Sequence, residues 1–284
     1  MNTLKNIYRK FGQLKNRVIS YVKYKKNKKY NSSGIEIKTE KSGEVKIVYA
    51  DESHIMTTFF DINPVSPCGR FLVVTHVPFI DRIPFLGEIC TIKVIDLNNY
   101  NIIYTTTTEA WGSQLGANVQ WGINSETLHY NVIKNEKIIG ITKNITTNET
   151  IELKNAIYCI DIKNNISYSP YIEYFNSMIY GYSAPEKNPI TTSNQKKENK
   201  AIYISCLKTG ELIEQIFLDD IINKIRTQEK INYICPNIFH IKINTASDKI
   251  FFVLHSYNSY LKISPRKQLI LYDIKSCTFK VIVS

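Results

Sequence analysis

The chain has 284 residues, of which 43% are apolar and 21% are charged. This composition is typical of a globular protein with a large core, and it excludes an intrinsically disordered chain. The net charge of +11 is concentrated in residues 1–30, which hold ten of the 36 Lys and Arg residues and no acid, leaving 26 basic against 25 acidic residues in the rest.

Residues 1–30 are predicted to form a basic amphipathic helix, because apolar residues recur there at steps of three and four. Such a helix can lie on an anionic membrane, where each cation adds about 1 kcal/mol of attraction. The candidate membrane-binding residues are Lys5, Arg9, Lys10, Phe11, Lys15, Arg17, Lys23, Lys25 and Lys26. A solvated tail or a helix docked on the body is the alternative. Nucleic acid is the least favoured partner, because no aromatic platform accompanies the cations.

Residues 31–43 are expected to be a linker, and residues 44–284 a single β domain. The pattern there changes to the alternation of strands, and four segments resemble one another: 91–97, 156–162, 201–207 and 268–274. Each precedes a polar turn and a further strand. Turn-plus-strand pairs lie upstream, at 66–76, 123–133, 175–183 and 246–255.

Four strands per repeated unit predict an all-β fold, a β-propeller with four clear blades and an N-terminal amphipathic α-helix. A sandwich of the same strands is the alternative. Residues 43–50 would be a strand that completes the last blade, and the ring would be either a complete small one or one that lacks later blades. Residues 134–155 and 185–200 are expected to be insertions, and residues 219–228 a helix.

Cysteine and aspartate residues are expected to be structural. The six cysteines form no CxxC pair and no zinc-ligand spacing, and no secretory signal is visible, so a reducing cytoplasm is the expected location. Asp96, Asp161 and Asp273 recur at the ends of repeated strands, which indicates turn hydrogen bonds rather than an acid–base pair.

Three stretches carry a resemblance to TolB-like and oligogalacturonate-lyase-like propellers. SPCGRFLVVTH (66–76) resembles their blade opening, with Cys68 in place of the usual Asp, and residues 240–256 resemble a later blade, with Ser256 in place of an Arg. The stretch 105–131 is similar to uncharacterised bacterial members. The resemblance implies a link to glycan metabolism, and the lyases of that group use a metal held by His and Gln. Mn or Zn is therefore a candidate cofactor, but no ligand set in this sequence matches theirs, so no metal site is assigned.

The candidate ligand-binding residues are Trp111, Gln114, Asn118, Trp121, His76, His240 and His255. His76 and His255 fall at equivalent positions of two repeats, and with Gln114 and His240 they could form a polar, metal-binding cluster suited to an acidic sugar. Hydrogen bonds at strand ends are the alternative for both histidines. Trp111 and Trp121 could stack on a sugar ring while Gln114 and Asn118 bind its hydroxyls, or the two indoles could fill the space between blades.

The sequence therefore predicts a β-propeller binding or scaffolding module, peripheral to the inner membrane and linked to bacterial glycan or surface-polysaccharide metabolism. Its expected partners are a carbohydrate, the anionic membrane and other proteins. The alternative is an enzyme, a metal-assisted lyase or hydrolase of acidic oligosaccharides. The glycan part of the prediction depends on the resemblance alone.

Overall fold

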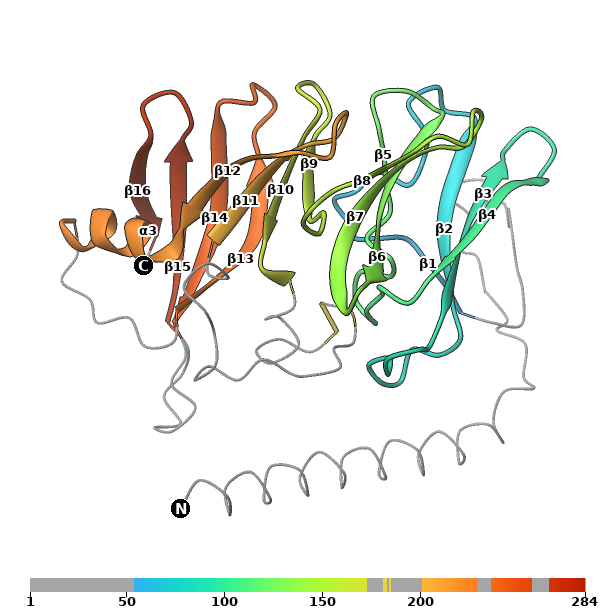
Figure 1. The fold of residues 1–284 in the computed structure, drawn as a ribbon, viewed down its shortest axis with the longest axis horizontal. Coiled ribbons are helices and arrows are strands. Elements are labelled where there is room, and N and C mark those ends of the chain that lie inside the picture. Colours follow the sequence, from blue (N-terminus) through green and yellow to red (C-terminus); the bar gives the residue numbers. More distant parts are fainter. Residues whose placement is uncertain are drawn as a thin grey trace, which may run out of the picture.

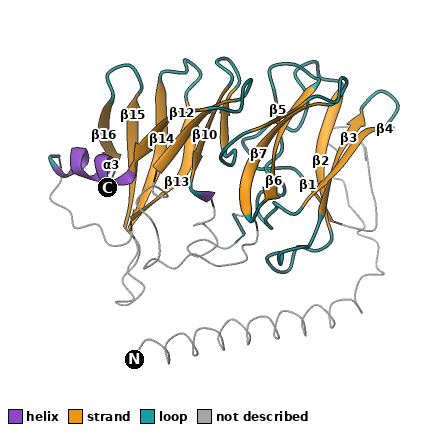
Figure 2. Cartoon of the chain, viewed as in Figure 1, coloured by secondary structure: helices purple, strands orange, loops and turns teal. Residues whose placement is uncertain are grey.

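In the computed structural model, the described residues are 54–172, 181, 182, 184, 201–228, 236–256 and 266–283. They form four antiparallel sheets of four strands each (Figures 1 and 2). Each sheet is built from four consecutive strands, so the predicted all-β fold of four-stranded blades is confirmed. The predicted helix 1–30 with its membrane-binding candidates, the linker 31–43 and the strand 43–50 lie outside the described residues.

The blades are named here in chain order. Blade 1 contains β1 (His54–Met56), β2 (Phe71–Val77), β3 (Cys90–Asp96) and β4 (Ile102–Thr108). Blade 2 contains β5 (Gln120–Trp121), β6 (Thr127–Lys134), β7 (Lys137–Asn144) and β8 (Thr150–Glu152). Blade 3 contains β9 (Cys159–Asp161), β10 (Ile166–Pro170), β11 (Ala201–Cys206) and β12 (Leu212–Phe217). Blade 4 contains β13 (Pro236–Ile243), β14 (Lys249–Ser256), β15 (Arg266–Asp273) and β16 (Thr278–Val283).

The blades stand side by side, with blade 1 and blade 4 at opposite ends of the row (Figure 1). Strand alternation places one apolar face of each sheet against its neighbour. Ile92, Trp121 and Leu128 belong to a core between blades 1 and 2, and Ile202, Phe252 and Ile270 belong to a core between blades 3 and 4. Apolar packing between neighbouring sheets therefore holds the row together.

The predicted helix at 219–228 is confirmed as α3 (Leu218–Arg226), which follows the outer strand of blade 3. Its buried face, made by Leu218, Ile221, Ile222 and Ile225, joins the core of blades 3 and 4. After the helix, Gln228 Nε2 donates to Phe279 O at 2.7 Å, and Val281 N donates to Gln228 Oε1 at 3.2 Å. This side chain thereby occupies part of the free edge of β16.

Two sequence predictions about blades 2 and 3 are wrong. Residues 134–155 were expected to be an insertion, but they hold β7 and β8, and residues 156–162 lead into the first strand of blade 3 rather than the third strand of blade 2. The hairpin β6–β7 turns at Asn135 and Glu136, which both have positive φ (50° and 63°). Such a turn usually carries Gly at its second position, so Asn-Glu gave no hairpin signal.

Blade 4 obtains all four of its strands from residues 236–283. That residues 43–50 complete the last blade stays a prediction, because these residues lie outside the described part of the chain.

Candidate ligand-binding site

Aromatic side chains from four separate stretches of chain meet on the inner side of blades 3 and 4. We call this group the hub cluster; it consists of Phe59, Tyr158, Tyr182, Phe239 and His240. The His240 ring lies 3.8 Å from the Phe239 ring, 5.8 Å from that of Tyr182 and 6.3 Å from that of Phe59, measured between centroids. Tyr158 Oη lies 3.4 Å from His240 Nδ1.

A β-bulge in β13 directs His240 into this cluster. The pairing register between β13 and β14 shifts between Phe239 and Lys242, and His240 has a φ of 52°. A bulge turns a side chain out of the strict alternation of a strand. The bulge therefore lets Phe239 and the following residue His240 contact the same aromatic group.

An ion pair lies beside the hub cluster. Lys242 Nζ is 2.6 Å from Asp61 Oδ2, and both side chains are about one-third exposed. Burial, together with the charge of Lys242, lowers the pKa of His240, and burial raises the pKa of Tyr158. At neutral pH the imidazole is therefore uncharged and the phenol keeps its proton, so both groups are available as neutral hydrogen-bonding partners.

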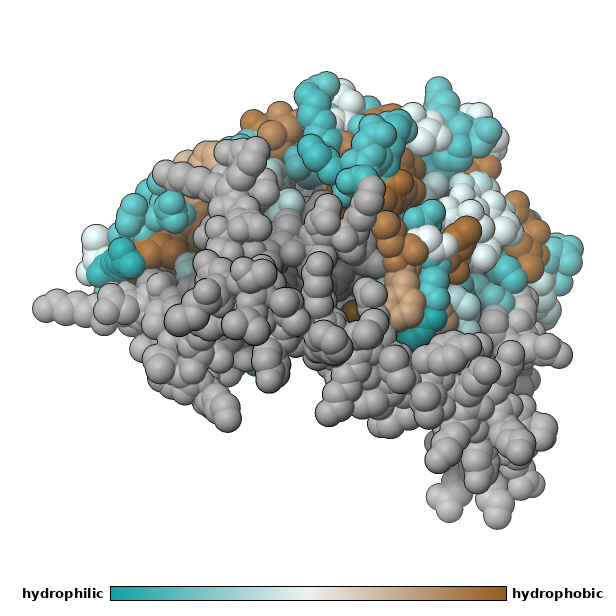
Figure 3. Space-filling view, turned by 60° about the horizontal axis from the view of Figure 1, so that its bottom comes forward, coloured by the Kyte–Doolittle hydropathy of each residue, from teal (hydrophilic) through white to brown (hydrophobic). Residues whose placement is uncertain are grey.

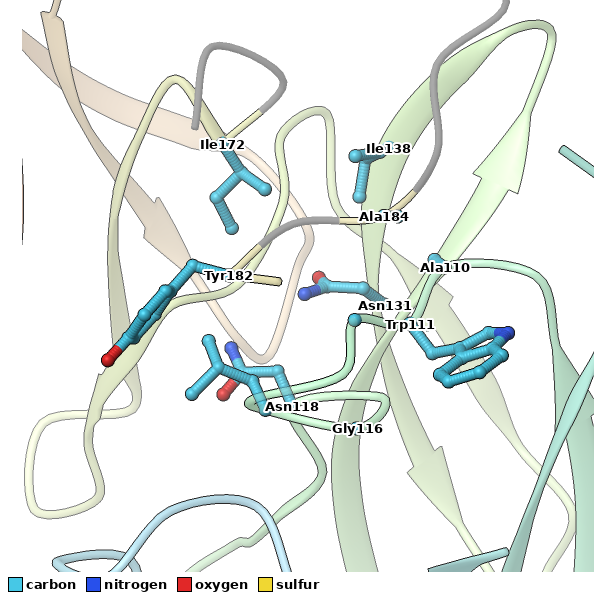
Figure 4. Close-up of a pocket in the computed structure, with 11 residues that line it drawn as sticks. Ala110, Trp111, Gly116, Asn118, Asn131, Ile138, Ile172, Tyr182 and Ala184 are labelled. Atoms are coloured by element: carbon cyan, nitrogen blue, oxygen red, sulfur yellow. The ribbon is translucent and has the colours of Figure 1, made fainter. Parts of the chain in front are cut away.

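A hollow of about 20 Å³, partly open to solvent, lies next to the hub cluster. Its enclosed part has room for about one water molecule. Ile172 and Tyr182 lie on one side of it and Ala110 and Trp111 on the other, with the carboxamides of Asn118 and Asn131 between them (Figure 4). Tyr182 belongs to both the hub cluster and the wall of the hollow. The two features are therefore continuous.

Side-chain amides of blade 2 bind the backbone that enters blade 3. Asn131 Oδ1 accepts from Ile157 N at 2.7 Å, and Asn131 Nδ2 donates to Ile157 O at 2.8 Å. Asn118 Nδ2 donates to the same carbonyl at 2.6 Å, and Gln120 Nε2 donates to Tyr158 O at 3.0 Å. This amide network fixes the position of Tyr158 in the hub cluster.

The structure brings four of the predicted site residues to this region. Trp111 and Asn118 line the hollow, and His240 belongs to the hub cluster. Gln114 is exposed, and its backbone N–H donates to Gly181 O at 2.9 Å, next to Tyr182. Trp111 is only 1% exposed and donates its indole N–H to Glu88 O at 2.7 Å, so no more than part of one ring edge faces the hollow.

The other three predicted residues lie elsewhere. Trp121 is in the core between blades 1 and 2 and donates its indole N–H to Pro64 O at 2.8 Å. His76 and His255 are the penultimate residues of β2 and β14, which are the second strands of blades 1 and 4. Their equivalent positions are thus confirmed. Within the described part of the chain, no three His, Cys, Asp or Glu side chains are grouped so that they could hold a metal ion.

Sequence reasoning missed most of the hub cluster. Phe59, Tyr158 and Tyr182 come from three connections, and Asp61 and Lys242 show no motif spacing. The one available signal was the repeated unit around residues 240–255, which indicated that His240 stands at the start of a blade.

Comparison with known proteins shows no family for this chain. No protein-family model matches the chain, and no curated protein matches it. Among solved structures, hydrazine synthase of Kuenenia stuttgartiensis is 9% identical, with a TM-score of 0.45, over 77% of this chain and 52% of that one. TolB from Acinetobacter baumannii is 10% identical, with a TM-score of 0.37, over 83% and 45%.

The β-propeller domain of the trilobed protease from Pyrococcus furiosus is 14% identical, with a TM-score of 0.36, over 78% of this chain and 69% of that one. The chain spans about half the length of the first two structures. At these TM-scores the likeness carries no argument. The class of the protein, a β-propeller, follows from its four consecutive four-stranded sheets.

Proposed function

We propose that this β-propeller protein is a binding module whose site is the hub cluster with the adjoining hollow, and that its ligand is an acidic carbohydrate. The observation that carries the proposal is the continuity through Tyr182 between aromatic rings and an amide-lined hollow. Flat aromatic faces pack on the apolar side of a sugar ring, while the phenol of Tyr158 and the neutral imidazole of His240 bind its hydroxyls. The amides of Asn118 and Asn131 hold the backbone behind these groups.

Two groups beside the hub cluster favour a sugar ligand that carries an acid. Phe60, 89% exposed, lies with its ring centroid 4.5 Å from that of Phe59 and offers a free aromatic face. Lys242 is held only by a partly exposed ion pair, which contributes about 1 kcal/mol or less. A carboxylate on a ligand can therefore replace Asp61 as its partner.

The test is calorimetric titration with acidic oligosaccharides selected on a glycan array. Phe60→Ala and Lys242→Met are each expected to weaken binding by about tenfold, the effect of losing one stacking or charged contact. Ile123→Ala, which removes another exposed apolar side chain, and Lys154→Met, which breaks another exposed ion pair, serve as matched controls. Equal affinities for all four variants would refute the site.

The enzyme alternative, a metal-assisted lyase or hydrolase of acidic oligosaccharides, is distinguished by turnover. Two results together would favour the enzyme over the binding module. One is stoichiometric Mn or Zn in the purified protein, lost in His255→Ala, and the other is the appearance of shortened or unsaturated products. Binding without product formation would support the module.

We also propose that residues 1–30 attach the module to an anionic membrane surface. This location would suit a role in surface-polysaccharide metabolism. The described residues contain no helix long and apolar enough to cross a bilayer. Ten cations without an acid support reversible electrostatic attachment. Deletion of residues 1–30 should release the protein from anionic vesicles, and salt should weaken the binding of the full chain; salt-insensitive binding would contradict the proposal.

A further inference from the structure

The loop between β2 and β3, residues 78–89, exposes four large apolar side chains. Ile80, Phe85, Leu86 and Ile89 are 57%, 36%, 42% and 52% exposed. The tip is a turn in which Glu88 N donates to Phe85 O at 3.0 Å and Gly87 has a φ of 88°. Turn tips usually carry polar residues, so an apolar pair at Phe85 and Leu86 needs an explanation.

The loop is held in shape by contacts among its own side chains. The Arg82 guanidinium lies 3.5 Å from the centre of the Phe79 ring and 4.5 Å from that of Phe85, and it forms an ion pair with Glu88. Glu88 Oε2 also accepts from Phe85 N at 2.6 Å. These contacts fix the exposed side chains before any partner binds, which lowers the entropic cost of binding.

The loop is also fixed to the body of the protein. The indole N–H of Trp111 donates to Glu88 O at 2.7 Å, and the ring of Trp111 lies 5.2 Å from that of Phe79. Trp111 also lines the hollow. The loop therefore packs directly on a residue that lines the candidate site.

The loop projects from the lower end of blade 1 in Figure 1, opposite the short turns at the upper end. Because antiparallel strands reverse direction at each turn, the β2–β3 and β4–β5 connections leave the sheets at the same end. When this end is turned forward, apolar side chains reach the surface between polar ones (Figure 3). The loop and the hollow thus share one end of the molecule.

We propose that loop 78–89 is a membrane-inserting wedge that places Ile80, Phe85, Leu86 and Ile89 at the boundary between lipid headgroups and acyl chains. The inference rests on the proposed membrane attachment through residues 1–30 and deepens it. An anionic bilayer offers charge for the ten cations of that segment and an apolar layer for the loop. The loop itself has no free cation, because Arg82 is paired with Glu88.

A lipid surface fits this shape better than a protein partner does. A specific protein interface buries about 800 Å² on each side, usually on a broad patch. The four exposed apolar side chains of loop 78–89, in contrast, all lie on one projecting loop. Two independent attachments, one electrostatic and one apolar, also give stable binding where either one alone is weak. The wedge would fix the orientation of the propeller, with its hollow facing the membrane.

The test uses the full chain and vesicles of phosphatidylcholine with phosphatidylserine. The double variant Ile80→Asp/Leu86→Asp is expected to bind at least about tenfold more weakly than the wild type, because two apolar contacts are replaced by charge. Ile123→Asp is the matched control, since Ile123 is 59% exposed in the β5–β6 turn at the opposite end. Its binding should equal that of the wild type.

A second measurement reads the depth of the loop directly. In Leu86→Trp, vesicles that contain brominated lipid should quench fluorescence more than they do in the wild type, whose Trp111 and Trp121 are buried. In Ile123→Trp no quenching beyond that of the wild type is expected. If the full chain binds but the double variant binds equally and Leu86→Trp is not quenched, the wedge is refuted and the attachment through residues 1–30 stands. If the full chain binds no vesicle, both membrane proposals fail, while the carbohydrate site is still judged by its own titration.

Discussion

His129 lies in β6 of blade 2, only 3% exposed, with its Nδ1 atom 2.9 Å from Thr142 Oγ1. Burial lowers the pKa of His129 to about 4. The unfolded chain takes up this proton near pH 6.5, so between these values the unfolded state binds more protons than the folded state. The contribution of neutral His129 to the stability of the folded protein is therefore complete above about pH 6.5. It is lost as the pH falls toward about 4.

His129→Gln should therefore make the free energy of unfolding less dependent on pH. In the wild type, the lowered pKa of His129 should reduce the free energy of unfolding by about 2 kcal/mol as the pH falls from roughly 7.5 to 5. Glutamine cannot be protonated and can still bind Thr142. Part of the dependence should remain, because burial also lowers the pKa of His240 and of His255.

Urea unfolding of both proteins at the two pH values measures this effect. A variant with the same loss of stability as the wild type would show that the imidazole of His129 is protonated without cost in the folded protein.

Elements of neighbouring blades are joined by more than apolar packing. Asn131 forms two hydrogen bonds with the backbone of Ile157, in the manner of one rung of a sheet. Ile157 can approach the backbone of β7 because residue 140 is a glycine. A Cβ atom on Gly140 would lie 2.5 Å from Ile157 Cγ1. Blade 2 and the entry to blade 3 therefore form one mechanical unit.

Asn131→Ala should lower the free energy of unfolding by about 1–3 kcal/mol, because the buried N–H of Ile157 would lose its partner. The carbonyl of Ile157 keeps its bond from Asn118 Nδ2. Asn99→Ala is the control; the exposed Asn99 Oδ1 accepts one local bond from Asn101 N at 3.0 Å, and its loss should cost under about 1 kcal/mol. Urea unfolding distinguishes them, and equal costs would mean that water replaces the partner of Ile157.

Most strands could be predicted from the sequence because alternation and polar turns are local signals. The segments 91–97, 201–207 and 268–274 were predicted as third strands, and they are β3, β11 and β15. Segment 156–162 was misplaced because the turn aspartate that ends a third strand also ends a first strand. Asp96 accepts from Asn98 N and Asp161 accepts from Lys163 N, in the same type of turn. The expected turn role of these aspartates is thus confirmed, but it does not identify the strand.

The hub cluster could not be predicted in the same way. It joins positions 59, 158, 182 and 240, and contacts at such separations are set by how the blades stack, not by any spacing along the chain. Asn118 was predicted to bind sugar hydroxyls, yet its amide is bound to Ile157 O. Sequence alone does not show whether a polar side chain faces a ligand or a neighbouring blade.

At the scale of the whole molecule, residues 58–61 connect the two end blades across the inner side of the row. They follow β1 of blade 1, and Thr58 Oγ1 donates to Val119 O of the blade 2 entry at 2.5 Å. Phe59 packs against His240, and Asp61 pairs with Lys242, both on β13 of blade 4. We call residues 58–61 the strap, because this short segment joins the first blade of the row to the last one on the inner side.

The strap predicts a difference between two adjacent phenylalanines. Phe59→Ala should lower the free energy of unfolding by about 2–3 kcal/mol, below the cost for a fully buried ring because Phe59 is only partly covered. Phe60→Ala should change it by less than about 0.5 kcal/mol, because that ring is 89% exposed. Urea unfolding provides both values under the same conditions.

Hydrogen exchange locates the effect. In Phe59→Ala, protection should fall along β13, the strand that the strap contacts in blade 4, while β6 and β7 of blade 2 keep theirs, because their pairing does not involve the strap. If protection falls equally in all blades, the strap is only one part of a common core. If Phe59→Ala and Phe60→Ala behave alike, blades 1 and 4 are held in place without the strap, and the packing between neighbouring sheets alone sets the geometry of the hub.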